Sequence, residues 1–359
     1  MTSERTDAGS HLRPEFLTVV KTIYSEMANL RSDEDVLIVA DSRTAPNVVN
    51  AFFGEALSIG ATAQVLLVPT PPPPSVQTSI VWSRTVRAAT TTPDLIVDLA
   101  VGYSDFFAEA VERGARVICP GDGTGADHLQ ETLLRTIAAV DIHALRAETG
   151  VLAELLTDAT TLRITSEEGT DLSVDIHGLR GDRDDGFLWD PERGEWKSRW
   201  QTLPPAVPGI VLPPGRANGT IAVDGFILYE PAYDHETPRT PLLLSIQDSW
   251  ISHIDGDPLT RERLSLWLEQ WAPDRSPYHG PVHVNVGLNP RAMLTQHQEF
   301  ETIRGTVVFG WGDSSIVARL FRLPIESIAS PVHWDCSVVR PTIDIDDRRV
   351  VERGSVQSL

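Results

Sequence analysis

Short apolar runs alternate with amphipathic stretches through the first half of the chain, and this alternation constrains the fold more than any other feature. The amphipathic stretches include residues 16–30, where apolar side chains recur every third or fourth position, and residues 46–59, which end at Gly60. Continuous apolar runs are typical of strands buried on both faces, and strands that alternate with helices form parallel sheets. The runs lie at residues 36–40, 63–68, 95–99 and 116–119. We therefore predict an α/β domain with a parallel sheet over residues 1–158, closed by a helix over 125–157.

After about residue 160 the pattern changes to alternation with period two. Residues 161–165 and 172–176 alternate in this way, and Glu167-Glu168-Gly169 between them indicates a hairpin. Further strands are predicted at 219–223, 226–229, 242–246, 250–254, 283–286, 306–309, 333–338 and 342–345, with one helix at about 259–271. Residues 178–206 are polar and predict a long irregular loop, a kind of segment that is often functional. The fold class is thus α/β, an N-terminal parallel-sheet domain followed by a β-rich α+β domain over residues 159–359.

The composition narrows the class of protein. The chain has 359 residues, 41% hydrophobic and 22% charged, with a net charge of −20. Such an acidic protein repels phosphate backbones and anionic membranes, so we expect neither nucleic acid nor membrane as a partner. The first 14 residues are polar and no run approaches the roughly 18 apolar residues of a membrane span, so we expect a cytoplasmic protein. Two cysteines are too few for a disulfide framework or a four-cysteine zinc site.

The strongest candidate for chemistry is His333-Trp334-Asp335, near the C-terminus. On an extended segment His333 and Asp335 point to the same side, because side chains alternate with period two. His283 lies 50 residues upstream (333 − 283 = 50) in another alternating run. Two histidines and one carboxylate leave open positions for O2 and substrate on ferrous iron. His-x-Asp alone is weak evidence, since the motif is common by chance.

Other candidate motifs fail. Residues 121–127 are rich in glycine and follow a strand, but they lack the Lys-Ser/Thr of a phosphate-binding loop and predict a tight turn. The proline run at residues 69–74 predicts a stiff segment where the chain leaves the second strand. His279 is four residues from His283, yet Gly280 and Pro281 disrupt a helix there, so we do not pair the two as ligands. The chain holds neither a Gly-x-Ser-x-Gly nor a His-Glu-x-x-His motif.

Several blocks, taken in their order and spacing, resemble the 2,5-dihydroxypyridine 5,6-dioxygenase family, which shares a superfamily with aminopeptidase T-like metallopeptidases. The resemblance runs through most of the chain. The blocks are residues 217–225, 250–256, 283–292, 305–310, 331–335 and 343–347.

The resemblance implies a ring-cleaving dioxygenase that uses Fe2+ and O2, with His283, His333 and Asp335 as the iron ligands. Two positions depart from the family pattern. Tyr103 stands where the family has a functional histidine after the third strand, and Arg199 is nearest to a second one in the long loop. A tyrosine donates a hydrogen bond but is a poor base, and an arginine fixes an anion without transferring its proton.

These departures predict a substrate other than 2,5-dihydroxypyridine, such as a carboxylated aromatic ring. We assign catalytic roles to Tyr103 and Arg199, and a substrate-binding role to Arg291, which follows the turn after His283. The alternative for Arg199 without a functional role is a surface ion pair with a nearby acid, such as Asp190, Glu192 or Glu195. We also expect a homo-oligomer.

Two other functional classes stay open. The first is a metal-dependent hydrolase, aminopeptidase-like, with a metal-activated water. Related aminopeptidases hold two metals with several carboxylates, and one of these is a glutamate where this chain has Arg216. A cationic side chain beside a second dication is unfavourable, which disfavours this class. The second is a non-catalytic relative with a structural metal, although structural sites are normally closed by four ligands.

Overall fold

The computed structural model describes residues 11–69, 82–120, 128–229, 234–293 and 298–359. The glycine-rich segment 121–127, for which we predict a tight turn, lies outside these residues. So does the proline run at 69–74, except for Pro69. The described chain divides into two compact units, each taken by itself below. Among the described residues, the first unit comprises 11–69, 82–120, 128–141 and 186–204, and the second comprises 142–185, 205–229, 234–293 and 298–359.

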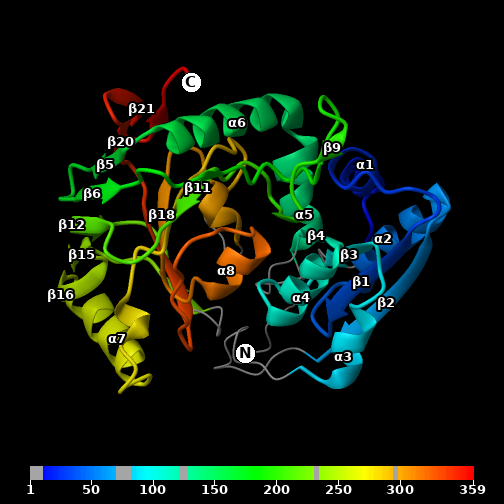
Figure 1. Cartoon of the computed structure of the whole chain (residues 1–359), viewed down its shortest axis with the longest axis horizontal. Helices are drawn as coiled ribbons and strands as arrows, with labels where there is room; N and C mark the ends of the chain where they lie inside the picture. Colours follow the sequence, from blue (N-terminus) through cyan, green and yellow to red (C-terminus); the bar gives the residue numbers. More distant parts are fainter. Residues whose placement is uncertain (1–10, 70–81, 121–127, 230–233, 294–297) are drawn as a thin grey trace. The chain divides into compact units, whose positions relative to one another are not determined.

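A five-stranded parallel sheet forms the centre of the first unit, in the order β10-β4-β3-β1-β2 (Figure 1). Its strands are β1 (Asp35–Asp41), β2 (Thr62–Val68), β3 (Leu95–Asp98), β4 (Arg116–Cys119) and β10 (Trp200–Thr202). The short β8 (Trp189–Asp190) and β9 (Glu195–Trp196) pair with each other. The predicted parallel sheet with crossover helices is confirmed.

The helices of the first unit include the two predicted at residues 16–30 and 46–59. They are α1 (Pro14–Thr22), α2 (Pro46–Ile59), α3 (Arg84–Ala89), α4 (Asp105–Arg113) and α5 (Leu129–Leu133), with π-helical turns at Ile23–Met27 and Leu134–Ala138. The helix α2 begins with Pro46 at its first position and ends at Gly60, whose φ of 96° is a left-handed conformation that glycine adopts without strain.

Two expectations about this sheet are wrong. The strand β2 is not buried on both faces, because it lies at the edge of the sheet and leaves Val65 44% and Leu67 66% exposed. The segment 178–206 is not one irregular loop. Its residues Trp200–Thr202 form β10, which pairs with β4 through Trp200 opposite Val117. A strand of three residues is too short to leave a periodic pattern in the sequence.

The helix α6 (Ile142–Asp158) belongs to the second unit by its contacts, whereas residues 186–204 belong to the first. The predicted closing helix over 125–157 is not continuous. Its described part consists of α5, the π-helical turn at Leu134–Ala138 and α6, which is the longest of the three. The domain boundary that we predict between residues 158 and 159 stays a prediction.

Two antiparallel sheets build the second unit, in agreement with the predicted β-rich half. The larger has the order β16-β15-β12-β6-β5-β20-β21-β22 and the other β14-β13-β19-β18-β17-β11-β7. The first contains β5 (Thr161–Thr165), β6 (Asp171–Asp175), β12 (Ala217–Val223), β15 (Leu242–Gln247), β16 (Trp250–Gly256), β20 (Thr342–Ile345), β21 (Arg348–Glu352) and β22 (Ser355–Val356). The second contains β7 (Gly181–Asp182), β11 (Gly209–Val211), β13 (Ile227–Tyr229), β14 (Asp234–Glu236), β17 (His283–Val286), β18 (Val307–Gly312) and β19 (His333–Val338).

Short helices complete the second unit. The helix α7 (Pro258–Glu269) begins after Asp257, whose carboxylate accepts a hydrogen bond from the backbone N–H of Thr260. The helix α8 (Ser315–Leu320) follows β18, and 3-10 turns lie at Ser276–Tyr278 and Gln298–Thr302. In the part of the chain that the structure describes, no helix is long and apolar enough to cross a membrane.

Candidate metal centre

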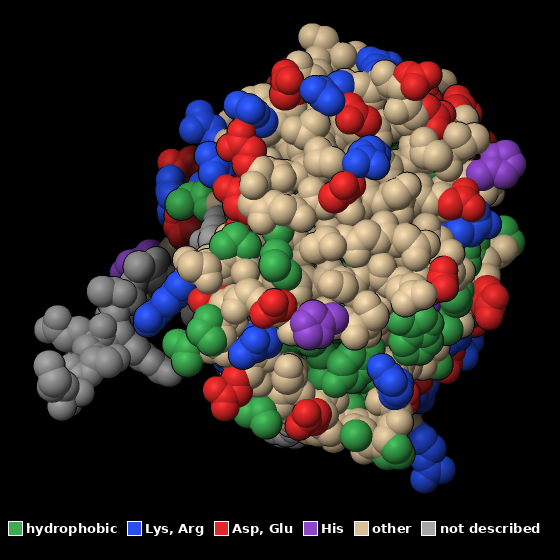
Figure 2. All heavy atoms as spheres, turned by 90° about the vertical axis from the view of Figure 1, so that its left-hand side faces the viewer, with side chains coloured by type: hydrophobic (Ala, Val, Ile, Leu, Met, Phe, Trp, Pro, Cys, Tyr) green, Lys and Arg blue, Asp and Glu red, His purple; other side chains and the backbone are tan. Residues whose placement is uncertain are grey.

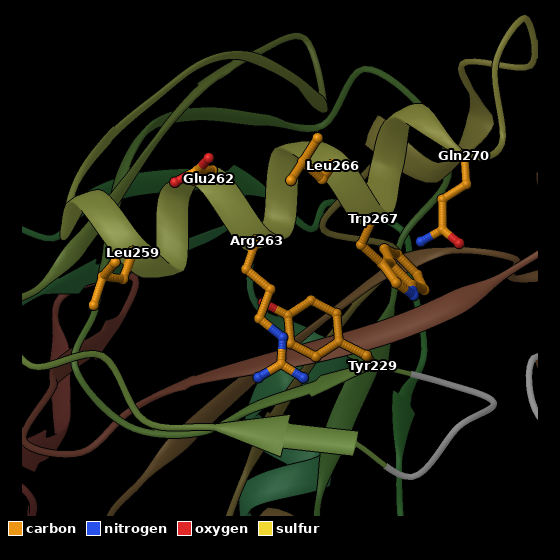
Figure 3. A pocket seen from close by; sticks show the side chains of 7 residues that line it. All are labelled: Tyr229, Leu259, Glu262, Arg263, Leu266, Trp267 and Gln270. Atoms are coloured by element: carbon orange, nitrogen blue, oxygen red, sulfur yellow. The ribbon is translucent and has the colours of Figure 1, made fainter.

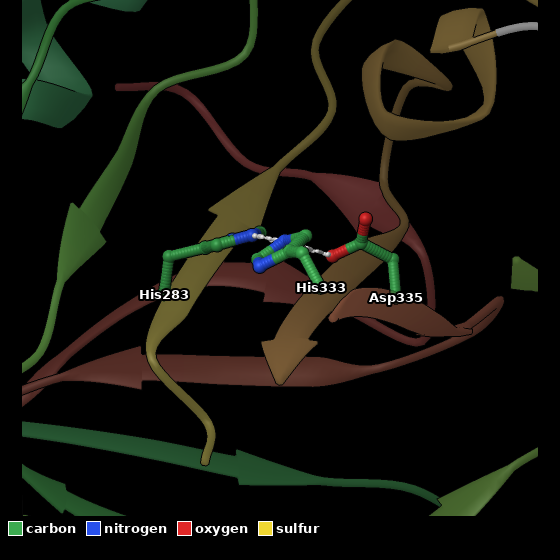
Figure 4. A group of neighbouring side chains, drawn as sticks. All are labelled: His283, His333 and Asp335. Carbon is green, nitrogen blue, oxygen red and sulfur yellow. Dashed lines mark hydrogen bonds and ion pairs between the residues drawn. The ribbon is translucent and has the colours of Figure 1, made fainter. Parts of the chain in front are cut away.

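Three adjacent strands of the seven-stranded sheet bring the predicted ligands together. His283 on β17, Gly310 on β18 and Asp335 on β19 lie in one row across the sheet, and His333 lies opposite Gly312. Because β17 and β19 are both antiparallel to β18, the two histidines begin strands that run in the same direction. Figure 4 shows the three side chains pointing toward one another.

The three ligand atoms form a small triangle. The Nε2 atoms of His283 and His333 are 3.2 Å apart, and they lie 3.2 Å and 3.3 Å, respectively, from Oδ1 of Asp335. Within the described residues no other cluster of three His, Cys, Asp or Glu side chains has ligand atoms so close together. The predicted triad therefore converges on one site.

A backbone carbonyl fixes the tautomer of His333. Its Nδ1 lies 2.7 Å from the carbonyl oxygen of Asp313 and donates a hydrogen bond to it, which leaves the lone pair of Nε2 directed at the triangle. Sequence reasoning missed this role of Asp313, because a backbone contact leaves no signal in residue type.

Asp335 is a buried carboxylate whose charge is held by the two imidazoles. It is 3% exposed, and its Oδ1 accepts no well-aligned hydrogen bond from the described residues. Burial raises the pKa of Asp335, but the adjacent His333 and His283 outweigh burial and hold the pKa well below its usual range. A buried, unsatisfied carboxylate oxygen beside two ring nitrogens is a site that a cation would satisfy.

The absence of a side chain at position 310 makes room for this arrangement. A Cβ atom on Gly310 would lie 2.0 Å from Nε2 of His283 and 2.2 Å from its Cδ2. The imidazole therefore lies across the backbone of β18, in space that any other residue would fill. Gly310 belongs to the block 305–310 that resembles the family, but the sequence alone did not indicate that it makes room for His283.

The donor set fits a first-row divalent ion. A triangle with edges of 3.2–3.3 Å leaves a point about 2.1 Å from all three atoms, the usual distance for nitrogen and oxygen ligands. Two neutral imidazoles and one carboxylate supply a single negative charge. Three protein ligands on one side of an ion leave the other positions for exchangeable ligands.

The opposite face of β19 is apolar. Trp334 and Cys336 alternate with the ligands, and the ring nitrogen Nε1 of Trp311 donates to the sulfur of Cys336 over 3.3 Å. Cys336 lies on the face opposite the ligands, and burial raises the pKa of its thiol.

Tyr103 lies in the first unit, whereas the ligand triad lies in the second. It follows β3 at the carboxyl edge of the parallel sheet, and its ring packs against Trp200 at 5.4 Å between centroids. Asp98, at the end of β3, accepts backbone N–H groups of Ala100, Val101 and Gly102, which shapes this turn. Burial raises the pKa of Asp98 to about 6, against these hydrogen bonds. The catalytic role of Tyr103 stays a prediction.

Arg199 lies at the other edge of the same sheet. It precedes β10, and its guanidinium donates to the carbonyl of Gly114, just after the end of α4. Tyr103 precedes the start of α4, so the two predicted catalytic residues lie at opposite ends of this helix. The structure does not bring these residues together, and the role of Arg199 stays a prediction.

Arg291 is exposed in the turn that follows β17. Its backbone N–H donates to the side chain of Asn289, which shapes the turn. The strand β17 begins at His283, so Arg291 follows the end of the strand that is farther from the ligand triad. Its substrate-binding role stays a prediction.

Comparisons with known proteins also indicate a dioxygenase. A sequence model of the 2,5-dihydroxypyridine 5,6-dioxygenase family matches residues 19–358. Among solved structures, the 2,5-dihydroxypyridine dioxygenase from Pseudomonas putida KT2440 is similar at a TM-score of 0.75, with 19% identity, over 96% of this chain and 97% of that one. AmpT from Thermus thermophilus is similar at a TM-score of 0.62, with 13% identity, over 95% and 98% of the two chains. A search of curated protein sequences finds no match.

The structural likenesses, at these identities, establish the fold. The family match spans nearly the whole chain, and it includes both strands that carry the predicted ligands. The chain therefore belongs to the 2,5-dihydroxypyridine 5,6-dioxygenase family and is a ring-cleaving dioxygenase.

Proposed function

We propose that the protein is an Fe2+-dependent dioxygenase that opens a hydroxylated aromatic or heteroaromatic ring, with His283, His333 and Asp335 as the iron ligands. The convergence of these three side chains is the observation that supports the proposal best. Ferrous iron would supply reversible binding of O2 and of the ring hydroxyl on its open side.

The residues of the chain prepare the site for this chemistry. The carboxylate of Asp335 offsets part of the charge of the ion, and the bond from His333 to the Asp313 carbonyl keeps one imidazole nitrogen free to coordinate. Burial of His283 and Asp335 excludes water from the ligand side, since these residues are 8% and 3% exposed.

For the substrate we propose a dihydroxypyridine or a related ring that carries a carboxylate. Arg291 is the residue behind this choice, because an exposed guanidinium can hold a carboxylate through charge-assisted hydrogen bonds. It follows the end of β17 that lies away from His283, so the carboxylate would have to reach it from the metal site along that strand. Tyr103 would donate a hydrogen bond to the ring substituents. A role of Arg199 toward the same anion would require its guanidinium to leave the Gly114 carbonyl, which lies at the opposite end of α4 from Tyr103.

A substrate panel tests the choice of ring. We expect Arg291→Gln to raise KM for a carboxylated hydroxypyridine or hydroxybenzoate much more than KM for the uncharged analogue, because only the acid loses a charge-assisted bond. Arg199→Gln tests the second arginine in the same way. Equal effects of Arg291→Gln on both rings would contradict a carboxylated substrate.

The alternative function, a metal-dependent hydrolase, requires a second metal site. Two-metal catalysis needs a second set of carboxylates about 3.5–4 Å from the first ion. The described residues offer one three-ligand cluster, and Arg216 pairs with Asp175 at 2.6 Å. Metal analysis separates the two functions: we expect one iron per chain after anaerobic purification, and two bound metals per chain would favour the hydrolase.

A further inference from the structure

The helix α7 carries apolar side chains on two faces. Its inner face, with Thr260, Leu264 and Leu268, is buried. On its outer face Leu259 and Leu266 are 61% and 58% exposed. Residues seven apart in a helix lie on one face, two turns from each other. A helix at a protein surface normally turns its apolar stripe inward only, so the second stripe of α7 indicates a partner.

A groove of about 540 Å³ follows this outer face (Figure 3). It is lined by Tyr229 and by residues of α7 from Leu259 to Gln270, so it extends over three helical turns. The ring of Tyr229 is buried beneath it, and the guanidinium of Arg263 lies 5.0 Å from the centroid of this ring. Figure 2 shows this side of the molecule, where hydrophobic side chains lie among charged ones. The shape of the groove suits an elongated partner.

The order of side chains along the outer face is self-complementary. Glu262 and Arg263 lie between the two leucines, so the order is apolar, acidic, basic, apolar. A two-fold axis midway between Glu262 and Arg263 places Leu259 opposite Leu266 of the partner subunit. The same axis places Glu262 opposite Arg263 of the partner subunit. An interface between identical chains has this reciprocal relation, and antiparallel helices pack closely enough to form it.

The charge of the face also favours a second copy as the occupant. The whole chain has a net charge of −20, whereas Glu262 and Arg263 are the only charged residues among those that line the groove, and their charges cancel. Copies of so acidic a protein repel each other, and the repulsion is weakest where the surface is neutral. A single aromatic ring on Trp267 would contact only one of two leucines that lie two turns apart. A second helix contacts both.

We propose that α7 is an interface between two copies of this chain, formed by antiparallel contact of the two helices across a two-fold axis. Leu259 and Leu266 are buried in it, and the pairs of Glu262 with Arg263 fix its register. Trp267 lies 6.4 Å from Trp334 of β19, on the side of the strand opposite to the metal ligands. Association through α7 therefore leaves the ligand triad uncovered, and it does not depend on the proposed function.

Charges at the two leucines test this pairing in the full-length protein by sedimentation velocity over a range of concentrations. We expect the wild type to associate. Leu266→Glu should raise the dissociation constant at least about 10-fold, because each pair of chains buries two carboxylates against leucine, and Leu259→Lys should act alike. The double variant, Leu259→Lys with Leu266→Glu, should recover association, because the two-fold axis sets each new cation opposite a new anion.

Leu57→Glu is the matched control, at a leucine of α2 that is 49% exposed, and it should associate like the wild type. A wild type that stays a monomer throughout would overturn the proposal, and so would single variants at α7 that associate as well as the wild type. Weakened single variants without recovery in the double variant would contradict the two-fold pairing. Binding of a hydroxybenzoate to a monomeric wild type, lost in Leu266→Glu, would assign the groove to a small ligand instead.

Discussion

At the scale of single residues, the site depends on the missing side chain at Gly310 and on the backbone carbonyl of Asp313 as well as on the three ligands. Gly310 leaves the space in which the His283 imidazole lies, and Asp313 orients His333 through its backbone alone. The two-residue spacing of His333 and Asp335 predicted that their side chains face the same side of a strand, and the family resemblance supplied the set of three ligands. The sequence could not predict either supporting residue, because their roles arise from the register of three strands.

Gly310→Ala should weaken metal binding by roughly 10–100-fold, the usual effect of disturbing the support of a ligand. The new methyl group would displace the His283 imidazole from the triangle. Iron titration followed by calorimetry measures the change. Gly54→Ala is the matched control, because a Cβ atom there meets nothing within 4 Å. An unchanged affinity in Gly310→Ala would contradict the geometry that we describe.

Asp335→Ala should abolish bound iron while circular dichroism stays that of a folded protein, since two remaining imidazoles bind weakly. Cys336→Ser, one residue along the strand on the opposite face, should keep its iron. Metal analysis of both purified variants checks the pair. Loss of iron in the serine variant alone would show that the facing of β19 is the reverse of the one described.

His279 should make the protein sensitive to mild acid. It is fully buried, neither ring nitrogen has a partner among the described residues, and burial lowers its pKa to about 4. An unfolded chain takes up this proton near pH 6.5, so stability is lost as pH falls from about 6.5 to about 4, by up to ~3 kcal/mol. In His279→Phe, urea unfolding at pH 7 and pH 4.5 should differ less than in the wild type. An equal difference would remove His279 as the cause.

At the scale of helices and strands, local pattern predicted most elements but not their neighbours. The apolar run of β2 is a strand as predicted, yet only tertiary structure places it at the edge, with Leu67 66% exposed. The three residues of β10 carry no periodicity, and their place beside β4 follows from the buried Trp200, which packs against Tyr103 and Phe107.

A pair of substitutions tests these two placements. Trp200→Ala should destabilise the protein by about 3–5 kcal/mol, because it empties a fully buried site. Leu67→Ala should cost no more than about 0.5 kcal/mol, as for other exposed side chains. Denaturant unfolding measures both. Similar losses for the two variants would mean that β2 is buried in solution.

At the scale of the whole molecule, the family was predictable from blocks between residues 217 and 347, all of which lie in the second unit. The match over residues 19–358 confirms the family that the sequence resembles. The cytoplasmic location and the homo-oligomer stay predictions. The roles of Tyr103 and Arg199 also stay predictions.

The central claim is that the triad supports cleavage of a ring by O2. Its most direct test is the stoichiometry of oxygen consumption by the iron-loaded protein with a hydroxylated pyridine or a carboxylated analogue. We expect about one O2 consumed per ring opened, no turnover under argon, and neither consumption nor turnover in Asp335→Ala, since a dioxygenase needs O2 where a metal-activated water does not. Full turnover under argon would contradict this claim.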